Sequence, residues 1–321
     1  MRFVIYGAGA IGGTIGGRLF EAGHDVTLIA RGEHLRVLRG EGLTLAAPAG
    51  TVTLPIPAVG EPRAAGLAGG DVVVLAMKSQ DTGPAVEALV RSAPPDITVV
   101  CAQNGVENER VALRSFPDVY AMSVMLPATH LRPGMVEANS AGAHGLLDLG
   151  RYPTGIDATA EAVADALTGG GFVSMARPDI MRWKYRKLIL NLANAVEAVC
   201  GPAARQSPLV ARVMEEGETV LAAAGIDPVT PAEDAERRAD HLPLRRVEGR
   251  RREGGSSWQS LTRGLGTIET DYLNGEIVLL ARLHGVPAPA NALLQRLAGE
   301  AAAERHPPGS IPPEDVLALL G

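Results

Sequence analysis

Short apolar runs alternate with helical patterns in the first part of the chain. The runs are rich in β-branched residues and predict strands at 2–7, 26–30, 71–77, 97–103 and 119–125. Helical spacing predicts a helix that begins within GAGAIGG and ends near Glu21, and two more at 81–93 and 106–115. This alternation predicts a parallel, doubly wound sheet of the Rossmann type. We expect residues 135–150 and 171–176 to add strands that close the sheet.

The second part of the chain lacks strand patterns and is dominated by helical periodicity. Helices are predicted at 179–199, 207–225, 231–240, 256–285 and 289–305, with a short last helix after the Pro-rich 305–315 segment. The predicted fold is therefore α/β, with a Rossmann-type domain over residues 1–177 and an all-helical domain over residues 178–321.

Composition excludes several classes of protein. The 321-residue chain is 46% hydrophobic and has a net charge of −6, which argues against a binder of nucleic acid or of anionic membranes. It has no membrane-length apolar run and starts directly with folded-domain sequence, so we expect a cytoplasmic protein. Two cysteines without metal-ligand spacing argue against a metal site. The oligomeric state stays open, and a homodimer is compatible with the sequence.

A glycine motif directly follows the first predicted strand. Its context, strand then turn then helix then strand, favours a dinucleotide-binding loop over an ordinary tight turn. The first glycine permits the turn, the second lets the backbone approach a pyrophosphate, and the third lets the helix pack closely. The residues predicted to hold the cofactor here are Gly7, Ala8, Gly9, Ala10, Ile11 and Gly12.

Polar residues follow three of the predicted strands. Arg31 stands where NAD-specific sites have an acidic residue, and a guanidinium suits a 2′-phosphate, so we expect NADP(H). The alternative for Arg31 is an ordinary surface arginine. Lys78 follows the strand at 71–77, where it would meet ribose or phosphate, and Asn104 follows 97–103, where it would meet the nicotinamide or the substrate.

A polar stripe interrupts the apolar helix KLILNLANAV. Lys187, Asn191 and Asn194 are spaced so that all three lie on one narrow face of a helix. Burying such a stripe costs free energy unless its polar groups find hydrogen-bond partners. The partner is either a polar ligand or neighbouring helix ends that the amides cap. Lysine is rare in this chain: only Lys78, Lys184 and Lys187 occur among the 30 basic residues.

Two further polar segments occur in the second part of the chain. Ser257 and Glu269 lie in the pattern Ser-Ser…Glu-x-Asp-Tyr-x-Asn-Gly, where Glu269 taken alone would be an ordinary solvated carboxylate. The basic segment LRRVEGRRREGG, residues 244–255, reads as a solvated loop, with anion binding as the alternative.

These motifs together resemble the ketopantoate reductase family over essentially the whole chain. The resemblance rests on GAGAIG, the lysine after a central strand, the pair Asn104-Gly105, the W-x(n)-K-L-x-x-N pattern, and the Ser…Glu-x-Asp-Tyr-x-Asn-Gly block that ends in HGVPAPAN. It implies an N-terminal domain that binds NADPH and a helical domain that supplies the substrate site. It further implies a catalytic Lys187, an active-site Glu269, substrate binding by Asn191 and Ser257, and a cofactor contact by Asn104.

The chain departs from the family pattern around the substrate site. Lys-Tyr-Arg separates Trp183 from Lys187, so Lys184 stays a second candidate for the catalytic lysine. Asn194 follows Asn191 by three residues rather than four, and the segment CGPAAR (200–205) lacks a further asparagine that the family has. The spacing Lys78-Ser79-Gln80 is also one residue shorter than usual.

The expected reaction is reduction of a 2-oxo acid by NADPH. Lys187 as an ammonium would bond to and protonate the ketone oxygen, and Asn191 and Asn194 would grip substrate oxygens. The expected substrate is ketopantoate, for pantothenate biosynthesis. The alternatives are another 2-oxo acid, an opine-type dehydrogenase, and a non-catalytic NADP(H)-binding sensor.

Overall fold

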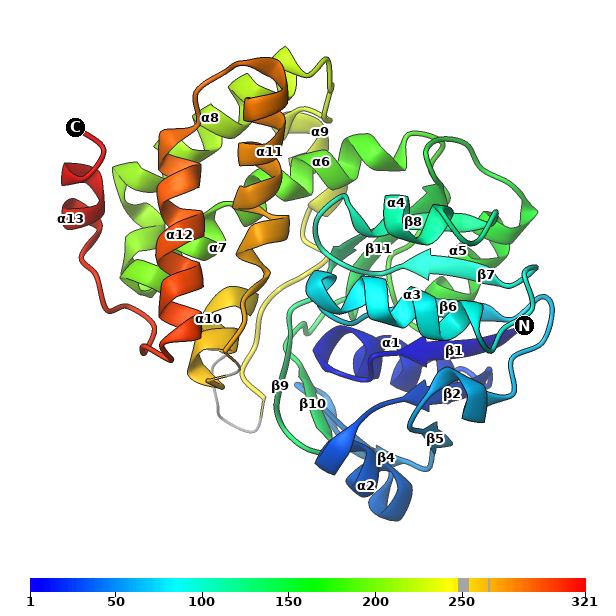
Figure 1. Cartoon of the computed structure of the whole chain (residues 1–321). Helices are drawn as coiled ribbons and strands as arrows, with labels where there is room; N and C mark the ends of the chain where they lie inside the picture. Colours follow the sequence, from blue (N-terminus) through cyan, green and yellow to red (C-terminus); the bar gives the residue numbers. More distant parts are fainter. Residues whose placement is uncertain (248–253, 265) are drawn as a thin grey trace. The chain divides into compact units, whose positions relative to one another are not determined.

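The computed structural model describes residues 1–247, 254–264 and 266–321 (Figure 1). The chain forms two compact units: unit 1 contains Met1–Lys184 with Pro231–Arg252, and unit 2 contains Tyr185–Thr230 with Glu253–Gly321. The compact units thus divide after Lys184 rather than after residue 177, and the chain returns to unit 1 once. The assignment of cofactor and substrate roles to the two halves stays a prediction. Half of the basic segment at 244–255 lies outside the described residues.

The main sheet of unit 1 has the predicted doubly wound order. In the described part of the chain its seven strands follow the order β11-β8-β7-β6-β1-β2-β5. Neighbouring strands pair in parallel, except that β11 runs antiparallel to β8. The winding reverses between β1 and β6, which is where such sheets bind ligands. The strands are β1 (Arg2–Tyr6), β2 (Asp25–Ile29), β5 (Ala58–Val59), β6 (Val72–Leu75), β7 (Thr98–Cys101), β8 (Val119–Met125) and β11 (Leu146–Arg151).

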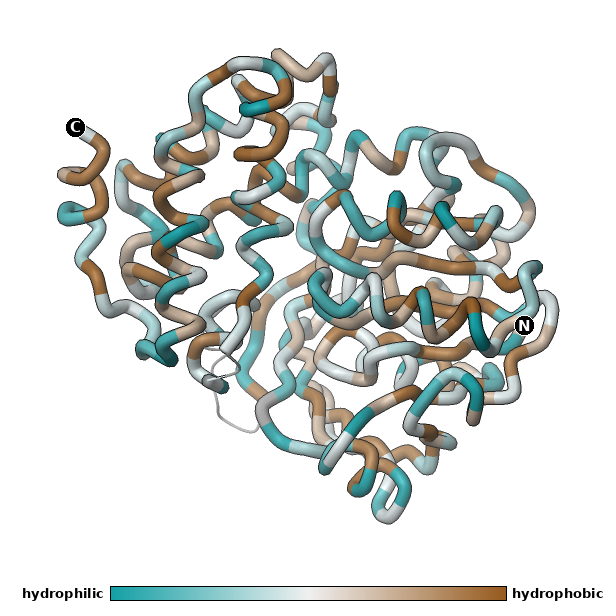
Figure 2. Tube along the Cα trace, in the orientation of Figure 1, coloured by the Kyte–Doolittle hydropathy of each residue, from teal (hydrophilic) through white to brown (hydrophobic). Residues whose placement is uncertain are grey.

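Helices cover both faces of this sheet, so its strands are apolar throughout (Figures 1 and 2). Phe3 and Ile5 of β1 belong to the core on one face, together with Ile15 of α1, whereas Val4 belongs to the core on the other face with Leu89 of α3. The helical elements of this part are α1 (Ala10–Glu21), α2 (Gly32–Glu41), η1 (Pro62–Ala65), η2 (Ser79–Asp81), α3 (Thr82–Val90), α4 (Asn108–Leu113) and α5 (Ala158–Gly169).

A second sheet in unit 1 was not predicted. Its order is β4-β3-β10-β9, from β3 (Leu43–Ala47), β4 (Gly50–Leu54), β9 (Ala128–Arg132) and β10 (Met135–Ala138). The expectation that 135–150 and 171–176 close the main sheet was wrong in part. Only β11 joins it, 135–138 lies in the second sheet, and Val173 and Ala176 make isolated bridges to β11.

Helix α1 packs against strands of both sheets, which its glycines permit. A Cβ atom at Gly13 would lie 2.8 Å from Val136 Cγ1 of β10, and one at Gly16 would lie 2.8 Å from Leu28 Cδ2 of β2. Both distances are too short for real Cβ contacts. An added Cβ at either position would therefore force a neighbouring side chain to shift, so glycine permits the close approach on two sides.

The second half of the chain is helical, as predicted, but with more breaks. The expected helix at 179–199 divides at Leu192. The one at 256–285 divides between Thr262 and Glu269, where Gly264 and Gly266 have positive φ, and again at Leu273. Helix α9 belongs to unit 1, and α6 crosses from unit 1 into unit 2. The elements are α6 (Ile180–Asn191), α7 (Ala193–Cys200), η3 (Pro202–Gln206), α8 (Pro208–Ala223), α9 (Pro231–Arg238), α10 (Ser256–Thr262), η4 (Glu269–Tyr272), α11 (Asn274–His284), α12 (Pro289–Ala303) and α13 (Pro313–Ala318).

A buried amide network fastens the helices of unit 2 to one another. Asn274 Nδ2 donates to Asn291 Oδ1 at 3.0 Å, and Asn291 Nδ2 donates to Val213 O and to Glu216 Oε2, each at 3.0 Å. Glu216 also accepts the backbone N–H groups of Ala290 and Asn291 at the start of α12. The network thus satisfies the helix N-terminus that the Pro-Ala-Asn sequence begins.

Candidate active site

The glycine loop combines a sharp turn and close packing with open space at its second glycine. Gly7 has φ +102°, and a Cβ atom there would lie 2.8 Å from the backbone nitrogen of Met77. A Cβ at Gly12 would lie 2.1 Å from Gly7 O, so that position is closed to any side chain. At Gly9, the residue that precedes α1, the nearest atom to such a Cβ is His130 Cδ2 at 4.0 Å. The open space at Gly9 and the helix N-terminus behind it fit a pyrophosphate.

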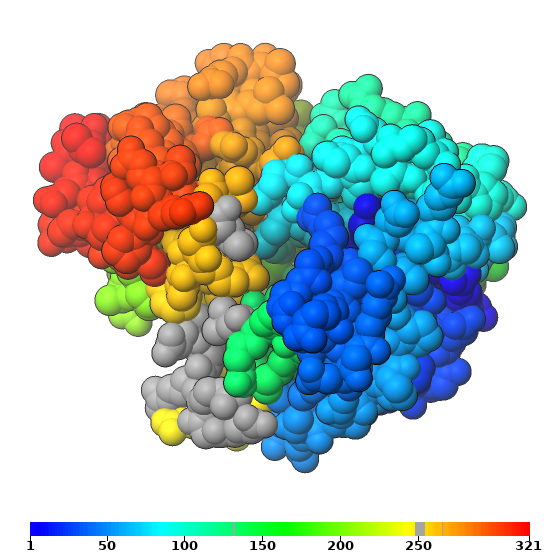
Figure 3. All heavy atoms as spheres, turned by 60° about the horizontal axis from the view of Figure 1, so that its bottom comes forward, coloured from blue at the N-terminus to red at the C-terminus, as the bar shows by residue number. Residues whose placement is uncertain are grey.

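Two histidines that we did not single out from the sequence lie beside this loop. His34 Nε2 lies 2.7 Å from Ala8 O, and the N–H of Gly134 donates to His34 Nδ1 at 2.8 Å. The amide donor makes Nδ1 the acceptor, so Nε2 carries the proton and donates to Ala8. The ring of His34 lies 4.4 Å from that of His130. Figure 3 shows α2, which carries His34, beside the segment around Gly134.

The environment of His34 favours its neutral form. Burial lowers the pKa of the imidazole, and the hydrogen bond to Ala8 opposes this shift in part. The sequence did not predict that His34 would bond to the glycine loop. Its contacts join α2 to Ala8 and Gly134, which are far from it along the chain.

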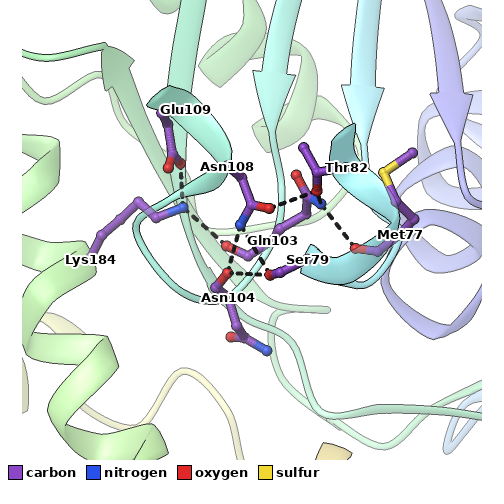
Figure 4. A network of polar contacts seen from close by, with 8 residues as sticks. All are labelled: Met77, Ser79, Thr82, Gln103, Asn104, Asn108, Glu109 and Lys184. Atoms are coloured by element: carbon purple, nitrogen blue, oxygen red, sulfur yellow. Dashed lines mark hydrogen bonds and ion pairs between the residues drawn. The ribbon is translucent and has the colours of Figure 1, made fainter. Parts of the chain in front are cut away.

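Polar side chains at the ends of β6 and β7 form a buried network (Figure 4). Asn108 Nδ2 donates to Asn104 O at 2.9 Å and to Ser79 Oγ at 3.2 Å, and its Oδ1 accepts from Thr82 Oγ1 at 2.7 Å. Ser79 Oγ also donates to Asn104 O at 3.3 Å. The network fixes the backbone of Asn104, whose side-chain amide points away from it. The segments that follow β6 and β7 are thus held together at the edge where the sheet is expected to meet its ligand.

Lys184 belongs to the same network. Its Nζ donates to Gln103 O at 3.0 Å and forms an ion pair with Glu109. The side chains are 3% and 0% exposed, respectively. Burial, reinforced by the negative charge of Glu109, raises the pKa of the neighbouring Cys101 thiol well above its ordinary value. Lys184 therefore has buried partners within unit 1.

The two predicted cationic contacts to the cofactor lie at the surface of unit 1. Arg31 follows β2 as the residue before α2, and its side chain is 78% exposed, with Nη2 3.6 Å from Asp81 Oδ1. Lys78 is half-buried directly before η2. Both follow strands that neighbour β1, the strand that leads into the glycine loop.

Unit 2 brings part of the predicted substrate site together. Asn194 Nδ2 donates to Asn191 Oδ1 at 3.4 Å, although the chain breaks between α6 and α7 at Leu192. Helix α10, which carries Ser257, packs against α7. Ser257 is 1% exposed, and its hydroxyl has no hydrogen-bond partner among the described residues. This buried hydroxyl is available to a ligand.

The other two predicted residues of unit 2 differ in burial. Lys187 is half-buried on α6, between Lys184 and Asn191. Glu269 is 2% exposed and begins the 3₁₀ turn η4, so it does not lie on the surface of a long helix as the sequence alone suggested.

Sequence reasoning missed two charged residues beside the asparagines. Glu197 continues the stripe of Asn191 and Asn194 at the same spacing, which was a usable signal. Arg205 returns to the stripe from η3, and its Nη2 donates to Asn194 Oδ1 at 2.8 Å. No spacing rule connects these positions, because Gly201 turns the chain between them.

Neither a metal-binding cluster nor a membrane-spanning helix occurs in the described part of the chain. There, no group of three or more His, Cys, Asp or Glu side chains is arranged to hold a metal ion. None of the helices described has both the length and the apolar composition to cross a membrane.

Comparisons with known proteins cover both halves of the chain. The family model "Ketopantoate reductase PanE/ApbA" matches residues 3–154, and the model of the same family's C-terminal part matches residues 179–302. The chain is 30% identical to the 2-dehydropantoate 2-reductase of Pyrococcus horikoshii over 306 residues, 92% of this chain and 96% of that relative. It is 31% identical to the enzyme of the same name from Halobacterium salinarum over 300 residues, 90% and 95% of the two chains.

Solved structures show the same fold. A PanE/ApbA family ketopantoate reductase from Ralstonia eutropha has a TM-score of 0.80 at 28% identity, with 95% of this chain and 99% of that chain covered. A D-mandelate dehydrogenase with NADH and anilino(oxo)acetate has a TM-score of 0.81 at 24% identity, with the same coverage. The second likeness concerns the fold alone.

Proposed function

The chain belongs to the ketopantoate reductase family and is an oxidoreductase acting on a CH–OH group, and on this premise we propose that it uses NADPH to reduce a 2-oxo acid, foremost 2-dehydropantoate. The observation that carries the proposal is the hydroxyl of Ser257, which is 1% exposed and has no hydrogen-bond partner among the described residues, on the helix that packs against α7, where Asn194 lies. A buried hydroxyl is costly unless a polar ligand meets it.

The glycine loop and Arg31 support NADP(H) as the cofactor. The loop fits a pyrophosphate, as described above, and a nicotinamide cofactor follows from the family. The exposed guanidinium of Arg31 offers paired donors of the kind that bind a 2′-phosphate. When bound, the reduced nicotinamide supplies the hydride that the ketone carbon gains.

Lys187 is the proposed proton donor. As hydride adds to the ketone carbon, negative charge develops on the oxygen, and an ammonium stabilises it and then protonates it. Glu269 would keep that lysine charged or orient a substrate hydroxyl. Asn191, Asn194 and Ser257 would hold the other substrate oxygens, and Asn104 would contact the nicotinamide or the substrate. Lys184 is the less favoured donor because its ammonium is buried against Glu109 and the carbonyl of Gln103, with a side chain only 3% exposed.

A second candidate keeps the reaction and changes the substrate. The short spacing from Asn191 to Asn194, and the presence of Arg205 in a segment where the family has a further asparagine, favour a 2-oxo acid other than ketopantoate. The two candidates differ only in the group beyond the oxo acid.

The test is NADPH oxidation, followed by absorbance, across a panel of 2-oxo acids that includes ketopantoate, pyruvate, 2-oxoisovalerate and phenylglyoxylate. The proposal expects turnover, with kcat/KM highest for ketopantoate under the first candidate. Highest activity on another member supports the second candidate. Binding of NADPH without turnover of any 2-oxo acid, or turnover only with an added amine, would contradict both.

A further inference from the structure

The carbonyl group between the first two glycines of the motif is held by His34. The N–H groups of Gly7 and Ala8 both donate to Ile29 O, at 3.0 and 3.3 Å, so strand β2 fixes the entry to the loop. The next peptide, Ala8–Gly9, is fixed at its carbonyl by His34 Nε2 at 2.7 Å. Glycine on both sides of Ala8 would otherwise leave this peptide easy to turn. One side chain of α2 thus sets the direction of the peptide that leads into α1.

The imidazole is itself oriented by the turn between β9 and β10. The N–H of Gly134 donates to Nδ1 at 2.8 Å, which leaves Nε2 of His34 to donate to Ala8 O. Gly134 has φ +75°, and a Cβ atom there would clash with Val37 Cγ1 of α2. The absence of a side chain therefore lets the turn approach the helix closely enough for this hydrogen bond.

Fixing the Ala8 carbonyl also fixes the N–H of Gly9. A peptide unit is planar and trans, so its C=O and N–H bonds point in opposite directions. Gly9 precedes α1, whose first N–H groups have no acceptor within the helix and whose dipole favours an anion. The space that a Cβ at Gly9 would take is open, with His130 Cδ2 as the nearest atom at 4.0 Å. The hydrogen bond from His34 therefore presents this N–H and the start of the helix in one arrangement.

We propose that His34 is a positioning residue for the cofactor, which holds the Ala8–Gly9 peptide so that the N–H of Gly9 and the first turn of α1 meet the pyrophosphate of NADPH. This inference rests on the proposed function and gives a role in it to a residue outside the glycine motif. Holding the loop in its binding arrangement lowers the ordering cost of cofactor binding. Without the donor of His34, the peptide can turn its carbonyl toward the phosphate, and a carbonyl oxygen offers a phosphate no hydrogen bond.

Two amide substitutions separate the donor of His34 from its acceptor. In H34Q the side-chain amide nitrogen lies about as far along the side chain as Nε2, so it still donates to Ala8 O. In H34N the amide lies nearer the backbone, where its oxygen replaces Nδ1 as the acceptor for Gly134 but no donor reaches Ala8. R36A removes an exposed guanidinium from the same helix, where it is paired with Glu33, and serves as the control.

The measurements are Kd for NADPH by fluorescence titration, and KM for NADPH and kcat with the best 2-oxo acid of the panel. We expect H34N to raise Kd and KM for NADPH about tenfold, or ~1.4 kcal/mol, because the loop is no longer held. Its kcat at saturating NADPH should stay within about twofold of the wild type, because His34 does not touch the reacting atoms. H34Q and R36A should each keep Kd within about threefold of the wild type.

Thermal unfolding is followed for every variant, and the titrations are made below the lowest unfolding temperature. If H34N does not fold, H34M takes its place, because methionine adapts to the same space and donates no hydrogen bond. An unchanged Kd in the variant without the donor overturns the inference. An equal loss of affinity in H34Q, or a lower kcat with unchanged Kd, overturns it as well. Turnover by the wild type then leaves the proposed function standing, whereas a wild type that does not bind NADPH removes both.

Discussion

The ammonium group of Lys184 is buried against the carboxylate of Glu109, with the carbonyl of Gln103 as its second partner. Breaking such a pair leaves a buried charge alone, at a cost of about 3–5 kcal/mol. We therefore expect K184M to lower the free energy of unfolding by about that amount, measured by urea denaturation. The double variant K184M/E109L should recover much of the loss, because no unpaired charge remains.

Replacing Lys187 should lower activity rather than stability. K187A removes one donor to a developing oxyanion, so kcat should fall by about a hundred- to a thousandfold. The free energy of unfolding should stay close to that of the wild type, since Lys187 is half-buried whereas the side chain of Lys184 is 3% exposed. A K187A enzyme with wild-type kcat would return Lys184 to consideration as the proton donor.

Alanine substitutions at two glycines of the same motif should have different effects, one on cofactor binding and the other on stability. At Gly9 an added Cβ meets nothing nearer than 4.0 Å, whereas at Gly12 it meets Gly7 O at 2.1 Å. G9A should fold normally and raise Kd for NADPH about tenfold or more, ~1.4 kcal/mol, because the methyl group occupies the space proposed for phosphate. G12A should instead destabilise unit 1, by on the order of 1–3 kcal/mol. Thermal unfolding and cofactor titration of both proteins check this, and normal NADPH affinity in G9A counts against the phosphate site.

Arg31 should determine the choice between the two nicotinamide cofactors. A hydrogen bond to a charged group is worth about 1.5–3 kcal/mol, so R31A should lower the NADPH-to-NADH ratio of kcat/KM by roughly ten- to a hundredfold. R36A removes an exposed guanidinium from α2, the helix that directly follows Arg31, and serves as the control because Arg36 is paired with Glu33. An unchanged ratio in R31A would show that the 2′-phosphate is bound elsewhere.

His34 should make the stability of unit 1 depend on pH. Its pKa in the folded chain lies below the ordinary 6.5, so as the pH falls the unfolded chain takes up this proton first. The contribution of neutral His34 is complete above pH 6.5 and is lost as the pH falls below that value toward the folded pKa. We expect H34Q, which does not titrate, to lose less stability than the wild type between about pH 7.5 and 5.5. Burial also lowers the pKa of His144, so only the difference between the two proteins is diagnostic.

The main sheet was predictable from the sequence because its strands are buried on both faces. Runs such as VVVL and TVVC fit few elements other than a buried strand, and the Gly7 motif predicts the turn after the first strand. The second sheet was not predictable in the same way. Its central pairing joins β3 to β10, which are distant along the chain, and local pattern carries no information about such a partner.

The residues of the candidate site likewise differ in whether local sequence patterns could predict them. The stripe of Lys187, Asn191 and Asn194 was visible as periodicity within one segment. The contacts of Arg205 with Asn194 and of His34 with Ala8 depend on turns and long-range packing, which residue spacing does not reveal. Glu269 was found by family resemblance, but its position in a short 3₁₀ turn follows from a helix break that the sequence reading passed over.

The hydrogen bonds of Asn274, Asn291 and Glu216 hold the helices of unit 2 together. They do not depend on which substrate the enzyme reduces. Selection for a folded protein alone would retain them. A descendant could therefore change its oxo acid entirely and still carry the Asn-Gly and Pro-Ala-Asn signatures by which its ancestry is recognised. Membership of this lineage is thus recorded in the residues of the scaffold, whereas under the proposed function the identity of the oxo acid depends on the residues around Asn191.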